Sequence, residues 1–132
     1  MKVFPSIKIY LDQSPIHGWG VFASQNIVEG ETIEVSPIID MEISKGESSP
    51  VLMNYRYNWP QGTSDWDKQV ISVGFSLLYN HSDTPNASWR SNMETNCFEF
   101  YALREINKDE EIFIYYGGSE YWNDGRTNIK II

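Results

Sequence analysis

The chain has 132 residues, which allows one domain, because two separate hydrophobic cores need a longer chain. Its formal net charge of −8 disfavours nucleic acid and anionic membranes as partners, since basic surfaces bind both. The acidic balance favours a basic partner, although it is about as typical of a protein that only needs solubility. One cysteine, Cys97, and two histidines are too few for a Cys/His zinc site, so we expect no metal.

The first residues carry no secretory signal, because polar side chains are spread throughout them. No apolar run approaches the length of a transmembrane helix. Two glycosylation sequons, at Asn80 and Asn86, are therefore interpreted as coincidence. We expect an intracellular protein in a reducing compartment, without membrane contact.

Apolar residues alternate with polar ones along most of the chain, and a period of two predicts strands. In residues 6–13, Ile7, Ile9 and Leu11 share one face. Further strands are expected at 21–24, 31–41, 87–91, 97–106 and 110–116. Residues 51–62 and 69–79 each fit either a strand or a short helix, and 41–50 predict a surface loop. Helical periodicity is scarce, so the pattern predicts a mostly β domain.

Two segments of the chain resemble each other. Residues 22–35 read FASQNIVEGETIEV, and residues 101–114 read YALREINKDEEIFI. Each predicts a strand, a turn and a second strand, with Gly30 and Asp109 at turn positions that suit a positive φ. This similarity predicts two hairpins and indicates no function by itself.

Three short motifs carry side chains suited to a binding site, although each has an ordinary structural explanation. His17-Gly18-Trp19-Gly20 is typical of a tight turn, in which glycines also let a ligand approach the backbone. Asn80-His81-Ser82-Asp83-Thr84-Pro85-Asn86 is typical of a loop whose side chains bond their own backbone. Tyr115-Tyr116 closes an apolar strand before two glycines, where aromatic residues are usually packing residues.

In combination, the order GWGVFA, IxxGE, NHSxxPN and AxxxIxxxEEIxIxYG resembles the SET domain family of protein lysine methyltransferases. The resemblance covers residues 8–122 and is greatest to the small stand-alone SET proteins of large algal viruses and some bacteria. It implies a single SET domain over 1–132, with the core at 8–122 and a short tail at 123–132. The implied fold is a β-clip of several short sheets with a C-terminal pseudoknot and little helix.

The resemblance also implies a cofactor, S-adenosyl-L-methionine, which is converted to S-adenosyl-L-homocysteine. In the family the Gly-x-Gly turn and the Asn-His segment hold it. Matching positions give the expected cofactor contacts as His17, Gly18, Trp19, Gly20, Asn80, His81, Tyr116 and Trp122.

Tyr116 matches the family's tyrosine at the end of the last strand, and the resemblance makes it the expected catalytic residue. A lysine ε-amine must be neutral to accept a methyl group, although its pKa in water is about 10.4. A narrow apolar channel disfavours the ammonium form, and a fixed hydroxyl can then aim the amine. We therefore expect Tyr116 to orient the substrate rather than to act as a base.

Aromatic rings suit a channel for the aliphatic stem and cationic end of lysine. The residues expected to line this channel are Tyr55, Tyr57, Tyr115 and Tyr121, with Trp59 as a further candidate. For the segment YRYNW, a place in the hydrophobic core is an equally good explanation.

The chain departs from the family pattern at Ser82, where many chromatin-directed members have a zinc-binding cysteine. No zinc-bound module can therefore follow the domain. Small size leaves apolar edges uncovered, which predicts a homodimer. The expected substrate is a basic protein tail, with a histone tail favoured. Such a substrate implies the nucleus and chromatin of a eukaryotic host, and other substrates imply the cytoplasm. The alternative is a non-catalytic SET-fold module that binds basic peptides.

Overall fold

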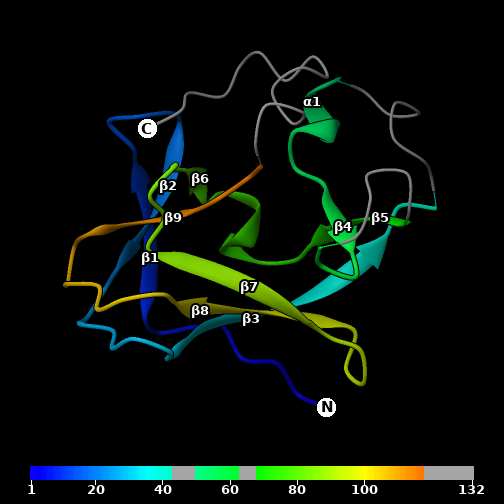
Figure 1. The fold of residues 1–132 in the computed structure, drawn as a ribbon, viewed down its shortest axis with the longest axis horizontal. Helices are drawn as coiled ribbons and strands as arrows, with labels where there is room; N and C mark the ends of the chain where they lie inside the picture. The colour runs from blue at the N-terminus through cyan, green and yellow to red at the C-terminus, as the bar shows by residue number, and fades with distance from the viewer. Residues whose placement is uncertain (43–49, 63–67, 118–132) are drawn as a thin grey trace.

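In the computed structural model, residues 1–42, 50–62 and 68–117 are described (Figure 1). Short strands dominate them and form two sheets, which confirms the predicted mostly β fold. The four-stranded sheet has the order β1 (Ile9–Gln13), β2 (Trp19–Ala23), β9 (Glu111–Ile114), β6 (Asn80–His81). The five-stranded sheet has the order β4 (Tyr57–Trp59), β5 (Lys68–Ser72), β3 (Thr32–Asp40), β8 (Cys97–Ala102), β7 (Ala87–Asn92). Helix is limited to α1 (Pro50–Met53) and the 3₁₀ turn η1 (Phe75–Leu77).

The two segments with ambiguous patterns each contain both predicted alternatives. Residues 51–62 continue α1 and then form β4, and residues 69–79 form β5 followed by η1. The strand predicted at 6–13 begins only at Ile9, because its pairing with β2 starts where Ile9 lies opposite Ala23. Ile7 lies before this pairing and is 82% exposed. The predicted loop at 41–50 lies mostly outside the described residues.

The prediction of two hairpins was wrong. Strands β2 and β3 lie in different sheets, and so do β8 and β9. Instead, the two similar segments pair with each other through Ile27 and Ile106, whose backbones exchange two hydrogen bonds of 2.8 Å. Each turn therefore carries the chain from one sheet to the other, and the two turns join the sheets.

Equivalent hydrogen bonds on the two turns show an approximate internal two-fold relation. The N–H of Gly30 donates to the carbonyl of Ala102 (2.8 Å), and the N–H of Asp109 donates to the carbonyl of Ala23 (2.7 Å). Gly30 has φ 82° and Asp109 has φ 69°, as expected for these turn positions. The sequence similarity therefore reflects packing between the two segments.

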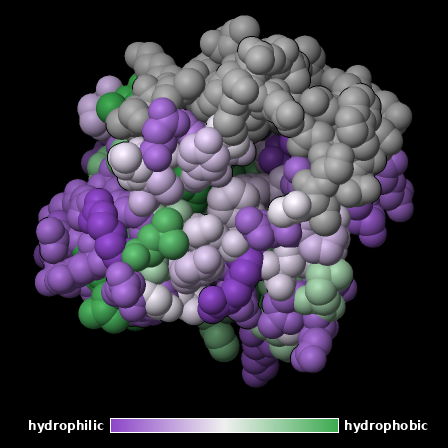
Figure 2. Space-filling model, viewed as in Figure 1, coloured by the Kyte–Doolittle hydropathy of each residue, from purple (hydrophilic) through white to green (hydrophobic). Residues whose placement is uncertain are grey.

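A cluster of buried apolar side chains draws on both sheets. It includes Ile9, Val21, Ala23, Ile27, Ile33, Trp59, Val70, Tyr79, Ala87, Phe98, Phe100, Ala102, Ile106, Ile112 and Ile114. The face shown in Figure 2 is mainly hydrophilic in its described part, with hydrophobic residues in small patches. Neither helix of the described segments is long and apolar enough to cross a membrane.

The last strand is enclosed by earlier parts of the chain. β9 lies between β2, which is antiparallel to it, and β6, which is parallel to it. Beyond β6, the Asn86 side chain donates to the carbonyl of Glu111 (2.9 Å) and accepts from the N–H of Phe113 (2.8 Å). This insertion belongs to the arrangement expected of the C-terminal pseudoknot, and it fixes β9, which is followed directly by Tyr115 and Tyr116.

Candidate functional site

Two cavities share a wall at the end of β9. The first, the aromatic cavity, has a volume of about 250 Å³, and the second, the loop cavity, about 280 Å³. The residues that line both cavities are Asn54, Tyr55, Leu77 and Tyr116. The predicted catalytic tyrosine therefore faces two separate spaces.

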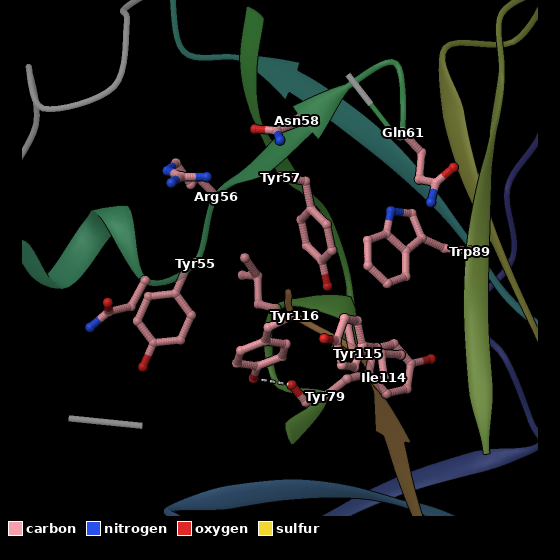
Figure 3. A pocket seen from close by; sticks show the side chains of 13 residues that line it. Tyr55, Arg56, Tyr57, Asn58, Gln61, Tyr79, Trp89, Ile114, Tyr115 and Tyr116 are labelled. Carbon is pink, nitrogen blue, oxygen red and sulfur yellow. Dashed lines mark hydrogen bonds between the residues drawn. The ribbon is translucent and has the colours of Figure 1, made fainter. Parts of the chain in front are cut away.

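The aromatic cavity is surrounded by tyrosine and tryptophan rings (Figure 3). Tyr55, Tyr57 and Tyr115, all predicted channel residues, line it. Trp59 does not, because it is buried and packs edge-on against Phe98 at 5.1 Å between ring centroids. For the segment YRYNW, the channel explanation fits the two tyrosines and the core explanation fits the tryptophan. The remaining channel candidate, Tyr121, lies outside the described residues.

Tyr116 is fixed at both its hydroxyl and its backbone. The hydroxyl donates to the backbone carbonyl of Tyr79, and the N–H donates to Nδ1 of His81 (2.8 Å). Burial raises the pKa of the Tyr116 hydroxyl well above its ordinary value, and nearby Tyr55 and Glu111 act in the same direction. The hydroxyl therefore stays protonated and cannot serve as a general base at neutral pH.

His81 is fully buried and lines neither cavity. Its Nδ1 accepts from the backbone of Tyr116, and its Nε2 lies 2.8 Å from Oδ1 of Asp83. Because Nδ1 is an acceptor, the proton is assigned to Nε2, which donates to Asp83. The imidazole thus positions Tyr116. Since both ring nitrogens are bonded within the protein, the predicted contact of His81 with the cofactor stays a prediction that concerns its backbone atoms.

The loop cavity gathers five of the predicted cofactor residues, which are His17, Gly18, Trp19, Asn80 and Tyr116. Nδ2 of Asn80 donates to the carbonyls of His17 (3.0 Å) and Trp19 (3.2 Å) and so shapes the turn. Gly18 has φ 50°, which other residues seldom adopt. Within the described residues, Oδ1 of Asn80 accepts no hydrogen bond. Another predicted cofactor contact, Trp122, lies outside the described residues.

Gly20 does not line the loop cavity, so its predicted cofactor contact stays a prediction, and its surroundings show a structural role. Behind it lies the buried carboxylate of Glu111, which accepts from the hydroxyl of Ser14 (2.9 Å) and from Nδ2 of Asn80 (3.0 Å). A Cβ at Gly20 would lie 2.5 Å from Oε2 of Glu111. Gly20 therefore leaves room for the carboxylate that holds Asn80.

Replacing Gly20 by alanine should lower the free energy of unfolding by about 1–3 kcal/mol, because the added methyl overpacks a fixed carboxylate. Gly18→Ala is the matched control, since nothing lies within 4 Å of its Cβ position. It should cost about 1 kcal/mol from backbone strain alone. Urea unfolding measures both, and an equal loss in the two variants would contradict the role assigned to Gly20.

A second buried carboxylate, Glu34 on β3, was not among the predicted site residues. It accepts hydrogen bonds from the hydroxyl of Tyr79 and from the backbone N–H of Phe75, each at 2.9 Å. Burial raises the pKa of Glu34 from 4.5 to about 6, and the two hydrogen bonds partly oppose that shift.

Glu34 should make the stability of the protein depend on pH. Its pKa is higher in the folded state, so the folded state binds more protons between pH 4.5 and 6. The stability that Glu34 contributes is therefore present below this window and is lost as pH rises through it, by about 2 kcal/mol in total. Urea unfolding of the wild type and Glu34→Gln from about pH 4 to about pH 7 should show their difference falling by that amount.

The matched control is Glu99→Gln on the neighbouring strand β8. Hydrogen bonds from Asn92 and Arg90 lower the pKa of Glu99, so its contribution should instead be lost as pH falls. The same sign of pH dependence in both variants would refute the assignment to Glu34.

Sequence analysis also missed Trp89, which lines the aromatic cavity from β7 and contacts the ring of Tyr57 at 5.4 Å. Because Trp89 alternates with Ala87 along the strand, the sequence predicted which face of the sheet Trp89 lies on but not that this face lines a cavity. Tyr79 was treated as the end of an apolar run, although its carbonyl receives the hydroxyl of Tyr116.

Comparison with known proteins tests the resemblance on which the site was predicted. The SET domain family matches residues 18–117, most of the chain. The chain belongs to the SET domain family. The matched range begins at the glycine turn of the loop cavity and ends just after Tyr116, so it contains every described part of β9 and its neighbours.

Two similar proteins have names that refer to histone methylation. A Schizosaccharomyces pombe protein named histone-lysine N-methyltransferase, H3 lysine-37 specific, is 34% identical over 118 residues, covering 87% of this chain and 77% of its own. The crystal structure of a candidate Plasmodium falciparum histone methyltransferase matches with a TM-score of 0.69 and 34% identity. The match covers 86% of the present chain and 96% of the Plasmodium chain. The kinship expected with viral and bacterial members stays a prediction.

A third similarity concerns the fold alone. A humanized mutant of Chaetomium thermophilum Polycomb Repressive Complex 2, bound to the inhibitor GSK126, has a TM-score of 0.61 at 21% identity. It matches 83% of this SET chain and 15% of the larger one.

The SET chain is a protein-lysine N-methyltransferase, and enzymes of this family take the methyl group from S-adenosylmethionine. Among residues 1–42, 50–62 and 68–117, no group of three His, Cys, Asp or Glu side chains is placed to hold a metal.

Proposed function

We propose that S-adenosylmethionine binds in the loop cavity and that the substrate lysine enters the aromatic cavity, so that both reach the shared wall at Tyr116. When bound, the cofactor supplies an electrophilic methyl group on a sulfonium. The residues present fit it: Asn80 lines the loop cavity, and since no donor among the described residues reaches its Oδ1, that oxygen suits an ammonium group. His17, Gly18 and Trp19 form the adjoining wall.

The aromatic cavity prepares the lysine. Its rings can pack on the aliphatic stem while excluding water, which disfavours the charged ammonium. Bringing the lysine pKa from about 10.4 to about 7 requires roughly 4–5 kcal/mol of such discrimination. The Tyr116 hydroxyl donates a hydrogen bond to the carbonyl of Tyr79, and because a hydroxyl oxygen also accepts, its role here is to accept an N–H from the amine. This contact would orient the nitrogen toward the loop cavity.

The proposed substrate is a histone tail, and the site of action is chromatin in the nucleus of a eukaryotic host. The fission yeast relative carries histone H3 lysine 37 in its name, and the net charge of −8 suits a lysine- and arginine-rich peptide. Because exposed charges are screened by salt, the Michaelis constant for the peptide should rise with ionic strength.

The observation that carries this proposal is the position of Tyr116 in the walls of both cavities. The test is incubation of the protein with labelled S-adenosylmethionine and either a mixture of core histones or a host cell lysate, followed by mass spectrometry, with binding of a histone peptide measured in parallel. Methyl groups on a histone lysine are expected. Labelling only of other proteins would overturn the histone assignment, and peptide binding without any labelling would overturn the assignment of catalysis.

A homodimer is proposed as well. Ile39 lies on β3 and is 57% exposed. Val73 directly follows β5, the strand that pairs with the end of β3, and is 43% exposed. A second copy could cover these apolar side chains. Sedimentation equilibrium at micromolar concentration should give twice the chain mass, whereas a clean monomer would refute the dimer.

A further inference from the structure

We infer that Glu34 is a positioning residue for methyl transfer, acting through Tyr79 on the hydroxyl of Tyr116; this inference rests on the proposed function. Glu34 lies on β3 and lines neither of the two cavities. Any effect on the reaction must therefore pass through residues that contact it.

Tyr79 links the buried acid to the site by its two ends. Its side-chain hydroxyl donates to Oε1 of Glu34 at 2.9 Å. Its backbone carbonyl accepts from the hydroxyl of Tyr116, the dashed contact in Figure 3. Tyr79 is 1% exposed, and its ring stacks on Phe100 at 4.9 Å between centroids. With the ring held in this way, the bond to Glu34 sets where the carbonyl points.

A second hydrogen bond from Glu34 holds the other end of the same segment. Oε2 accepts from the N–H of Phe75, which begins η1. Gly74 makes this approach feasible, because a Cβ there would lie 2.6 Å from Oε2. One carboxylate thus fixes residues 75–79 at both ends, immediately before the Asn80 that lines the loop cavity.

Both contacts of Glu34 are donors, so the ionised carboxylate is the form that satisfies them. A neutral acid would turn one oxygen into a donor and weaken one of the two bonds. The titratable groups around this path are Tyr57 beside Tyr79, and Tyr55, Glu111 and His81 beside Tyr116. Since burial brings the pKa of Glu34 to about 6, we expect kcat to rise with pH through that value.

Glu34→Gln tests the inference, because glutamine keeps the shape but has one oxygen and one NH₂ group. It can accept from only one of the two donors at a time. We expect kcat at pH 8 to fall about tenfold, the Michaelis constants to stay within about twofold, and the inflection near pH 6 to disappear. Glu99→Gln, on the neighbouring strand β8, should keep the wild-type kcat and profile.

Two further measurements keep the test decisive. Tyr79→Phe removes the same hydrogen bond, and it should lower kcat as much as Glu34→Gln, with the double variant no worse than either. In the protein without cofactor, the carbon NMR resonance of the Tyr116 ring should shift with pH near 6 in the wild type and not in Glu34→Gln.

Wild-type kcat in both variants, or a fall in kcat that leaves the inflection and the NMR shift in place, would overturn the inference while leaving the proposed function intact. A wild-type protein that methylates no protein at all would overturn both.

Discussion

Replacing Tyr116 by phenylalanine should lower kcat for lysine methylation by about 100-fold or more, in the range found when one orienting hydrogen-bond group is lost from an active site. The variant keeps the ring in the wall of both cavities but loses the hydroxyl that donates to the carbonyl of Tyr79. Nothing then orients the amine. Binding of S-adenosylmethionine should change by less than about threefold, because the aromatic surface remains.

The measurement is steady-state methylation of a histone peptide, with cofactor affinity from calorimetry. Tyr101→Phe is the matched control, since Tyr101 lies on β8 and its ring contacts Arg90 rather than either cavity. A Tyr116→Phe variant with near wild-type kcat would remove Tyr116 from catalysis. A variant with equal losses in kcat and cofactor affinity would make it a binding residue.

Replacing Asn80 by aspartate should abolish measurable cofactor binding and lower the free energy of unfolding by about 3–5 kcal/mol. Asn80 is 4% exposed, and its NH₂ group donates hydrogen bonds to the carbonyls of His17 and Trp19 and to the carboxylate of Glu111. Aspartate keeps the shape but puts an acceptor where three acceptors converge, 3.0 Å from a second carboxylate. The loop cavity would then lose the bonds that shape its turn.

Asn92→Asp is the matched control for this change. Its Nδ2 also donates to a carboxylate, that of Glu99 at 3.1 Å, but Asn92 is only partly buried. Solvent should screen the new charge, so we expect a loss below about 1 kcal/mol. Urea unfolding and calorimetry with S-adenosylmethionine measure both variants. If the two substitutions lower the free energy of unfolding equally, Asn80 does not hold the turn of the loop cavity in place.

Much of the fold could be predicted because strand period and turn chemistry are local. The alternation around Ile9 and the turn positions of Gly30 and Asp109 needed no knowledge of distant contacts. The hairpins could not be excluded, because the same local pattern also fits a turn that passes between sheets. Contacts between residues far apart in sequence decide between them, such as that of Ile27 with Ile106 and the pairing of β2 with β9.

The site was predicted through the order of its motifs, and its internal supports were not. Asn80 and His81 were predicted to contact the cofactor, yet both are buried and their side chains are hydrogen-bonded within the protein. Glu34 has no sequence signal beyond an acid in an apolar strand, and Glu111 belongs to the family motif, but nothing in that motif indicates a contact with Asn80. Their roles follow from neighbours that only the folded chain brings together.

The most direct test is a crystal structure with S-adenosylhomocysteine and a lysine-containing peptide of histone H3. The account predicts the cofactor product beside Asn80 in the loop cavity and the lysine side chain between Tyr55 and Tyr115 in the aromatic cavity. Sulfur and amine nitrogen should face each other next to the Tyr116 hydroxyl. A cofactor bound elsewhere, or a lysine outside the aromatic cavity, would contradict it.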